Sequence, residues 1–159
     1  MRGLVMHKLF EEVLNGETAD TAAALEARAS DLLRHLGQEP SLDATTGFSA
    51  AEISGAIVRA LALPEIPDLR PTLTPELPVY AFETREDGDV ATAGVADAVS
   101  YDASGRARVV VDWKSDVDPV PDILSHYQDQ VRAYLRATGA EKGLIVLATK
   151  GVAIGVSAK

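Results

Sequence analysis

The first third of the chain has apolar residues at the spacing of helices that bury one face. In residues 4–14, leucine, valine and phenylalanine recur every four or five positions, and Gly16 follows as a stop signal. A similar pattern runs from about residue 18 to 36. A third begins with a Ser-x-x-Glu capping box at 49–52 and ends at Pro64. The pattern predicts three helices, with a loop between the second and the third.

Residues 64–78 contain five of the eight prolines, so we expect an irregular connector within one domain. The period then changes to that of strands. Residues 109–111 are three consecutive valines, which is typical of a central strand covered on both faces. The predicted strands are 77–82, 90–101, 106–113, 144–148 and 152–156, with one helix at about 122–138.

This order predicts a single α/β domain with a mixed β-sheet flanked by helices. We divide it into N-terminal helices (1–63), the connector (64–78) and a core (76–159). The length of 159 residues fits one domain. No stretch has the roughly 20 apolar residues of a membrane span, and the N-terminus does not resemble a signal peptide. We therefore expect a cytoplasmic protein that does not contact a membrane.

Composition excludes several kinds of site. With no cysteine, the chain has no disulfide, thiolate zinc site, iron–sulfur cluster or cysteine nucleophile. The net charge is −9, and residues 41–90 hold three basic against nine acidic groups. Proteins that bind nucleic acid by neutralising phosphates are normally basic, so we expect weak autonomous DNA binding. The acidic pairs Glu11-Glu12 and Glu86-Asp87 are expected on solvated surface.

The most informative segment is Asp112-Trp113-Lys114, directly after the three valines. Strand alternation places Asp112 and Lys114 on one face, where charges cost free energy unless paired or bound. If Ser104-Gly105 is a two-residue hairpin loop, Asp97 on the preceding strand lies opposite Asp112. A four-residue loop leaves the carboxylates diagonal on one face. A three-residue loop puts them on opposite faces unless a bulge intervenes.

Two converging carboxylates are a plausible site for Mg²⁺ or Mn²⁺. The alternative is a structural Asp–Lys pair at a hairpin, and the residues alone leave both open. His7 is a further candidate ligand, though a lone histidine near a terminus is usually incidental. Gln130 and Tyr134 lie one turn apart on the last predicted helix. They would either hydrogen-bond a carboxylate or phosphate, or simply pack on the sheet.

In this order, the segments resemble the nuclease domain of the RecB-like branch of the PD-(D/E)XK superfamily, found in RecB- and AddA-type helicase–nucleases. The resemblance covers nearly the whole chain. Residues 38–75 match no segment of the family, and we expect them to be an insertion. Each motif alone is weak, but five in the right order are specific. They are Arg2-Gly3-Leu4-Val5-Met6-His7, Glu76-Leu77-Pro78, Gly94-Val95-Ala96-Asp97, Asp112-Trp113-Lys114 and the Y-x-x-Q-x-x-x-Y helix from Tyr127 to Tyr134.

The resemblance implies a restriction-endonuclease-like fold and metal-dependent hydrolysis of DNA phosphodiesters by an exonuclease. Lys114 would orient the attacking water and offset phosphate charge, rather than act as general base. The implied catalytic residues are Asp97, Asp112, Lys114, Gln130 and Tyr134. The implied ligands of one or two Mg²⁺ or Mn²⁺ ions are His7, Asp97, Asp112 and the backbone carbonyl of Trp113.

The implied partners are single-stranded DNA and an ATP-dependent helicase motor, fused or associated. The 159 residues contain no Walker motif, so we expect them to be the C-terminal part of a DNA-repair helicase–nuclease. Two other functions stay open: a non-catalytic DNA-guiding module, and a protein-docking module of a repair helicase.

Overall fold

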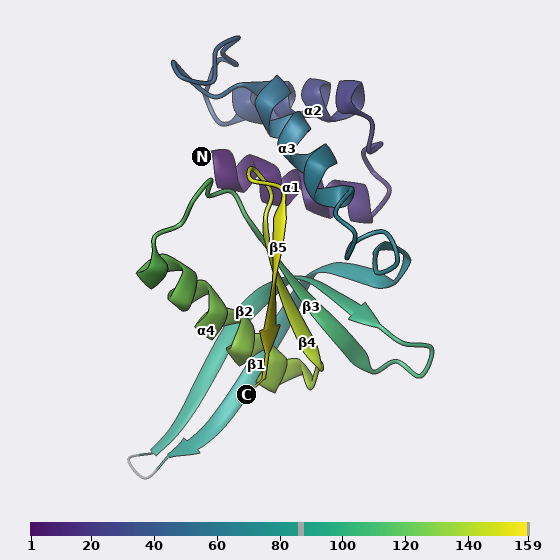
Figure 1. The fold of residues 1–159 in the computed structure, drawn as a ribbon, viewed down its shortest axis with the longest axis vertical. Coiled ribbons are helices and arrows are strands. Elements are labelled where there is room, and N and C mark those ends of the chain that lie inside the picture. Colours follow the sequence, from purple (N-terminus) through teal and green to yellow (C-terminus); the bar gives the residue numbers. More distant parts are fainter. Residues whose placement is uncertain (86–87, 159) are drawn as a thin grey trace.

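The computed structural model describes the backbone of residues 1–85 and 88–158, and the side chains of residues 1–80 and 93–158. The predicted order of helices and strands is present (Figure 1). The elements are α1 (Arg2–Leu14), α2 (Ala22–His35), α3 (Ala50–Leu61), the 3₁₀ helix η1 (Arg70–Thr72), β1 (Leu73–Arg85), β2 (Gly88–Tyr101), β3 (Ala107–Lys114), α4 (Pro121–Thr138), β4 (Lys142–Leu147) and β5 (Val152–Ser157).

The five strands form one sheet in the order β1-β2-β3-β4-β5. Neighbouring strands are antiparallel except β3 and β4, which are parallel and joined through α4. This mixed sheet with flanking helices confirms the predicted fold class. Among the described residues, no helix is both long enough and apolar enough to cross a bilayer.

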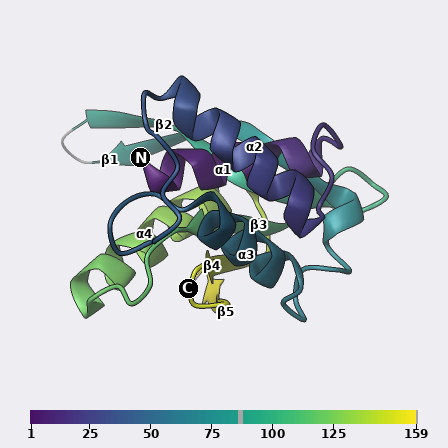
Figure 2. The same ribbon diagram turned by 90° about the horizontal axis from the view of Figure 1, so that it is seen from above.

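The sheet separates two hydrophobic clusters. α1, α2 and α3 gather over one face, and α4 lies along the other (Figures 1 and 2). Along β3, Val111 and Trp113 face the three helices, whereas Val110 faces α4. The Trp113 ring stacks on Phe10 of α1, with centroids 4.2 Å apart. The continuous apolar run of β3 therefore reflects burial on both sides, as predicted.

Local capping explains where two helices begin. Ser49 Oγ accepts the backbone N–H of Glu52 at 3.4 Å, as the capping box predicts. The second helix begins at Ala22, not near Thr18, because Thr21 is its N-cap. The backbone N–H of Thr18 instead donates to the carbonyl of Glu12, which turns the chain after α1.

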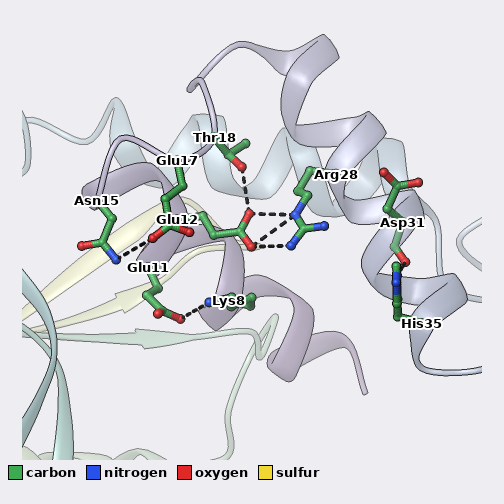
Figure 3. Close-up of polar contacts among 9 residues, drawn as sticks. All are labelled: Lys8, Glu11, Glu12, Asn15, Glu17, Thr18, Arg28, Asp31 and His35. Atoms are coloured by element: carbon green, nitrogen blue, oxygen red, sulfur yellow. Dashed lines mark hydrogen bonds and ion pairs between the residues drawn. The ribbon is translucent and has the colours of Figure 1, made fainter.

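Glu12 is a buried charge, so its expected place on solvated surface is wrong. Its carboxylate accepts hydrogen bonds from Arg28 of α2 (2.7 to 3.2 Å) and from the Thr18 hydroxyl (2.8 Å), as Figure 3 shows. The helical periodicity could not reveal this pair because its partner lies 16 residues away. The other acidic pair, Glu86-Asp87, lies outside the described residues.

The last part of the expected connector is also different. β1 begins at Leu73, so Pro75 and Pro78 lie within a strand instead of an irregular segment. Proline has no N–H to donate, and strands tolerate it mainly at the edge of a sheet. β1 is such an edge strand, with β2 as its neighbour in the sheet. Pro75 and Pro78 therefore mark the sheet edge, whereas Pro64 and Pro67 lie in an irregular segment, as predicted.

Candidate active site

The β2–β3 hairpin sets the register of the predicted carboxylate pair. Its loop has three residues, 103–105, flanked by a hydrogen bond from the Asp102 N–H to the Arg106 carbonyl (2.9 Å). Gly105 has a φ of 79°, the left-handed conformation that such loops require. Without compensation, this loop would place the carboxylates on opposite faces.

A bulge restores the register. Tyr101 pairs with Ala107 but Ser100 pairs with Val109, so Arg108 is the extra residue on β3. Ala98 then pairs with Val111, and the same register places Asp97 opposite Asp112. Of the three loops considered, the structure has the three-residue loop with a bulge, which produces the same register as the two-residue loop.

Asp97 lies where the alternation of β2 is interrupted. Ala98 packs with the α1–α3 cluster, whereas Ala96 and Val99 both pack with the α4 cluster. The Asp97 carboxylate accepts the backbone N–H of Trp113 at 2.7 Å. Its other oxygen lies 3.3 Å from Nδ1 of His7 on α1. Asp97 thus joins the end of β3 to the first helix.

Glu76 completes a group with these two residues. One ligand atom each from His7, Glu76 and Asp97 lies within 4.8 Å of the others. Glu76 is the residue of β1 between Pro75 and Leu77, which pair with Ala98 and Ala96. Its φ of 51° is in the left-handed region, which is strained for a residue other than glycine.

Asp112 and Lys114 face α4, as the alternation of β3 predicts. The Lys114 ammonium donates to Asp112 Oδ1 at 3.0 Å and to Gln130 Oε1 at 3.1 Å. Gln130 in turn donates to the Tyr134 hydroxyl at 3.0 Å. The four predicted residues form one hydrogen-bonded chain from β3 into α4. Asp112 is 1% exposed and does not belong to the group of His7, Glu76 and Asp97.

Tyr127, another aromatic residue of α4, contacts Lys114 directly. The Lys114 ammonium lies 4.6 Å from the centre of the Tyr127 ring, within the range of a cation–π interaction. The Tyr127 hydroxyl donates to Asp116 at 2.9 Å. Burial and this bond raise the pKa of Tyr127 to about 12. The hydroxyl is therefore a fixed hydrogen-bond donor at neutral pH.

The acidic groups of the site are crowded. Burial and the neighbouring Asp97 charge raise the pKa of Asp112 to about 6, although Lys114 opposes the shift. Burial and Asp97 also raise the pKa of Glu76. For His7, burial lowers the pKa, but the hydrogen bond and charge of Asp97 outweigh it, so the pKa is raised overall. A cation placed among these groups would relieve the repulsion.

The comparisons with known proteins bear on this arrangement. The family model of the PD-(D/E)XK nuclease superfamily matches residues 1–154. The chain belongs to this superfamily. As a member of the PD-(D/E)XK superfamily, it has the fold that the match implies, and the superfamily is one of metal-dependent nucleases.

Among solved structures, the crystal structure of SSO0001 is similar to this PD-(D/E)XK chain. The two share 18% identity with a TM-score of 0.44. The similarity covers 83% of this chain and 61% of SSO0001, so the chain spans about three fifths of that protein. No curated protein was found to match the sequence.

The donor set of this PD-(D/E)XK site fits a divalent cation. Carboxylates suit Mg²⁺ and Mn²⁺, and they make up two of the three members of the group, with the His7 imidazole as the third. Asp112 adds a second observation. Its Oδ2 lies 2.9 Å from the Lys114 nitrogen but is not aligned with any hydrogen-bond donor among the described residues. A buried carboxylate oxygen in this state still has lone pairs to offer a cation.

Two residues of the site were not predicted in their roles. Glu76 was not among the predicted metal ligands, although the Glu-Leu-Pro resemblance included it and the register places it opposite Asp97. Asp116 was not considered. Its position two residues after Lys114 was the available indication, but its bond to Tyr127 depends on how α4 packs.

Proposed function

We propose that this chain is a Mg²⁺- or Mn²⁺-dependent deoxyribonuclease of the RecB-like kind, acting on single-stranded DNA. The observation that supports it most is the convergence of His7, Glu76 and Asp97 within 4.8 Å. Beside this group, hydrogen bonds connect Asp112, Lys114 and Gln130. Ligands for a divalent cation thus lie next to a lysine that can contact a phosphate.

In this proposal, His7, Glu76, Asp97 and Asp112 hold the cation, with the Trp113 carbonyl as a further ligand. A divalent cation supplies Lewis acidity and lowers the pKa of water. The Lys114 ammonium offsets negative charge on the phosphate and orients the attacking water. Gln130 and Tyr134 act through Lys114, because their hydrogen bonds fix its ammonium on the side facing α4.

The charge of the chain supports the proposed dependence on a helicase. The net charge is −9, and several of the cations are already paired, including Arg28 with Glu12 and Lys150 with Asp118. Phosphate contacts sufficient for tight binding are therefore scarce. We propose that an associated or fused ATP-dependent helicase delivers the strand and that the domain degrades it as an exonuclease.

The test is cleavage of end-labelled single-stranded DNA with Mg²⁺, with Mn²⁺ and with EDTA. We expect cleavage with either metal, none with EDTA, and none with Lys114→Ala. Lys150→Ala is the matched control, because Lys150 also pairs with an aspartate but at an exposed position. Metal binding without cleavage would favour the alternative, a non-catalytic DNA-guiding module. No metal binding would contradict the proposal.

A further inference from the structure

A second polar cluster lies beside the candidate metal site, at the start of α1. The Arg2 guanidinium binds Glu52 of α3 through two parallel hydrogen bonds of 3.0 and 2.7 Å. It also donates to the backbone carbonyl of Ser115 and to the Thr149 hydroxyl. The Thr149 hydroxyl donates to the same carbonyl at 2.8 Å. One arginine thus joins α1, α3, the end of β3 and the β4–β5 turn.

The geometry of this cluster requires an arginine. The planar guanidinium fork engages a carboxylate with two bonds and still has N–H groups free for other acceptors. A lysine has a single ammonium and cannot reproduce the fork. Both side chains of the pair are largely buried, with Arg2 23% and Glu52 30% exposed. The contact is therefore less screened than a surface ion pair.

Gly3 brings α1 unusually close to the same point. A Cβ atom at this position would lie 3.3 Å from the Ser115 hydroxyl oxygen, closer than nine in ten such contacts. The missing side chain therefore lets the first turn of α1 pack against the residue that follows Lys114. Arg2 and Gly3 together fix the start of the helix on the exit of β3.

This anchor acts on the metal site through α1. His7 lies five residues after Arg2, about 7 to 8 Å further along the helix axis. Ser115 follows directly on the segment Asp112–Lys114. A shift of α1 against β3 would therefore change the 3.3 Å approach of His7 to Asp97. The anchor touches none of the proposed ligands, so its effect would be on their placement.

We propose that Arg2 is a positioning residue that sets His7 against Asp97 by clamping α1 to the Ser115 carbonyl. This inference rests on the proposed metal-dependent function. Arg2→Lys should weaken Mn²⁺ binding, measured by titration calorimetry, by about 10-fold, as loss of a group supporting a metal ligand typically does. Arg70→Lys is the matched control, because Arg70 forms a comparable ion pair with Asp20 (2.6 Å) away from β3. It should leave Mn²⁺ affinity unchanged.

A covalent replacement of the clamp separates positioning from folding. The chain has no cysteine, so Gly3→Cys with Ser115→Cys gives one defined pair, and a Cβ atom at position 3 would lie 3.3 Å from the Ser115 Oγ. Oxidation of this pair in the Arg2→Lys background should restore Mn²⁺ affinity, and reduction should remove it again. Thermal melts of each form would show that the protein is folded.

The outcomes distinguish the two proposals. If wild-type protein binds no Mn²⁺, the proposed function fails and this inference fails with it. If wild-type protein binds Mn²⁺ and Arg2→Lys binds equally well, only the role of Arg2 is overturned. It is also overturned if the disulfide forms but fails to restore Mn²⁺ affinity.

Discussion

The Asp97 carboxylate accepts the backbone N–H of Trp113 at 2.7 Å, so a side chain satisfies a peptide donor at the end of the β2–β3 ladder. The other Asp97 oxygen is 3.3 Å from His7. One residue therefore has a structural and a proposed metal-binding role, and two substitutions can separate them.

Asp97→Asn keeps an oxygen that can accept the Trp113 N–H but removes the charge. We expect it to fold with little change in melting temperature. Its Mn²⁺ affinity should fall at least 100-fold, which is more than the loss typical of a residue that only supports a metal ligand. Asp97→Ala should in addition lose about 1 to 3 kcal/mol of stability, because a part-buried donor loses its partner. Calorimetry and urea unfolding measure both effects. Equal stability of the two variants would contradict the structural role.

Asp112→Asn should stabilise the metal-free protein at neutral pH. The folded-state pKa of about 6 lies above the unfolded value of about 3.9, so the charged carboxylate destabilises the fold. The penalty is complete above pH 6 to 7 and disappears as the pH falls below about 4. We expect a gain of about 2 kcal/mol at pH 8 and almost none at pH 4, measured by urea unfolding with EDTA present. A gain independent of pH would contradict this cause.

Lys114→Ala should abolish cleavage while metal binding persists, because Lys114 is a cation and not a ligand. We expect a loss of at least 100-fold in single-turnover rate, the size seen when one charge-stabilising group is removed. Tyr134→Phe should reduce the rate less, since it deletes one hydroxyl that reaches Lys114 through Gln130. Quenched-flow assays at saturating Mn²⁺ measure these rates. Faster cleavage by Lys114→Ala than by Tyr134→Phe would refute the assignment.

Arg28→Ala should destabilise the fold without affecting the metal site. Glu12 is buried, and its partner Arg28 holds the pKa of Glu12 below its usual range (Figure 3). Because the Arg28 side chain is 36% exposed, water replaces part of its contacts, and we expect a loss of about 1 to 3 kcal/mol. Because the depressed pKa stabilises the fold above the unfolded pKa, the loss should appear at pH 7 and shrink as the pH falls below 4. Urea unfolding at several pH values tests this, with unchanged Mn²⁺ affinity as the control.

The isolated chain should bind single-stranded DNA weakly and with a shallow dependence on salt. With 15 basic residues against 24 acidic ones, few phosphates can be neutralised, and the slope of log affinity against log salt scales with their number. Fluorescence anisotropy at several salt concentrations measures it. Submicromolar binding at physiological salt, with a steep slope, would mean that the chain neutralises phosphates without a helicase.

The sequence alone determined the helices, the strands, the shared face of Asp112 and Lys114, and the shared face of Gln130 and Tyr134. Each depends on short-range periodicity, either the alternation of β3 or the one-turn spacing of Gln130 and Tyr134 on α4. The capping box at Ser49 is equally local. These features need no knowledge of how distant segments pack.

Only the tertiary structure decided the remainder of the site. Four features depend on residues that are far apart in the sequence, where helix or strand periodicity makes no prediction. They are the bulge at Arg108, the position of Glu76 beside Asp97, the burial of Glu12 and the contact of Arg2 with Ser115. Their contacts follow from how α1 packs on the sheet and how two hairpins set their register. A one-residue difference in the β2–β3 ladder would have moved Asp112 to the other face, and the turn sequence did not specify which register the fold would adopt.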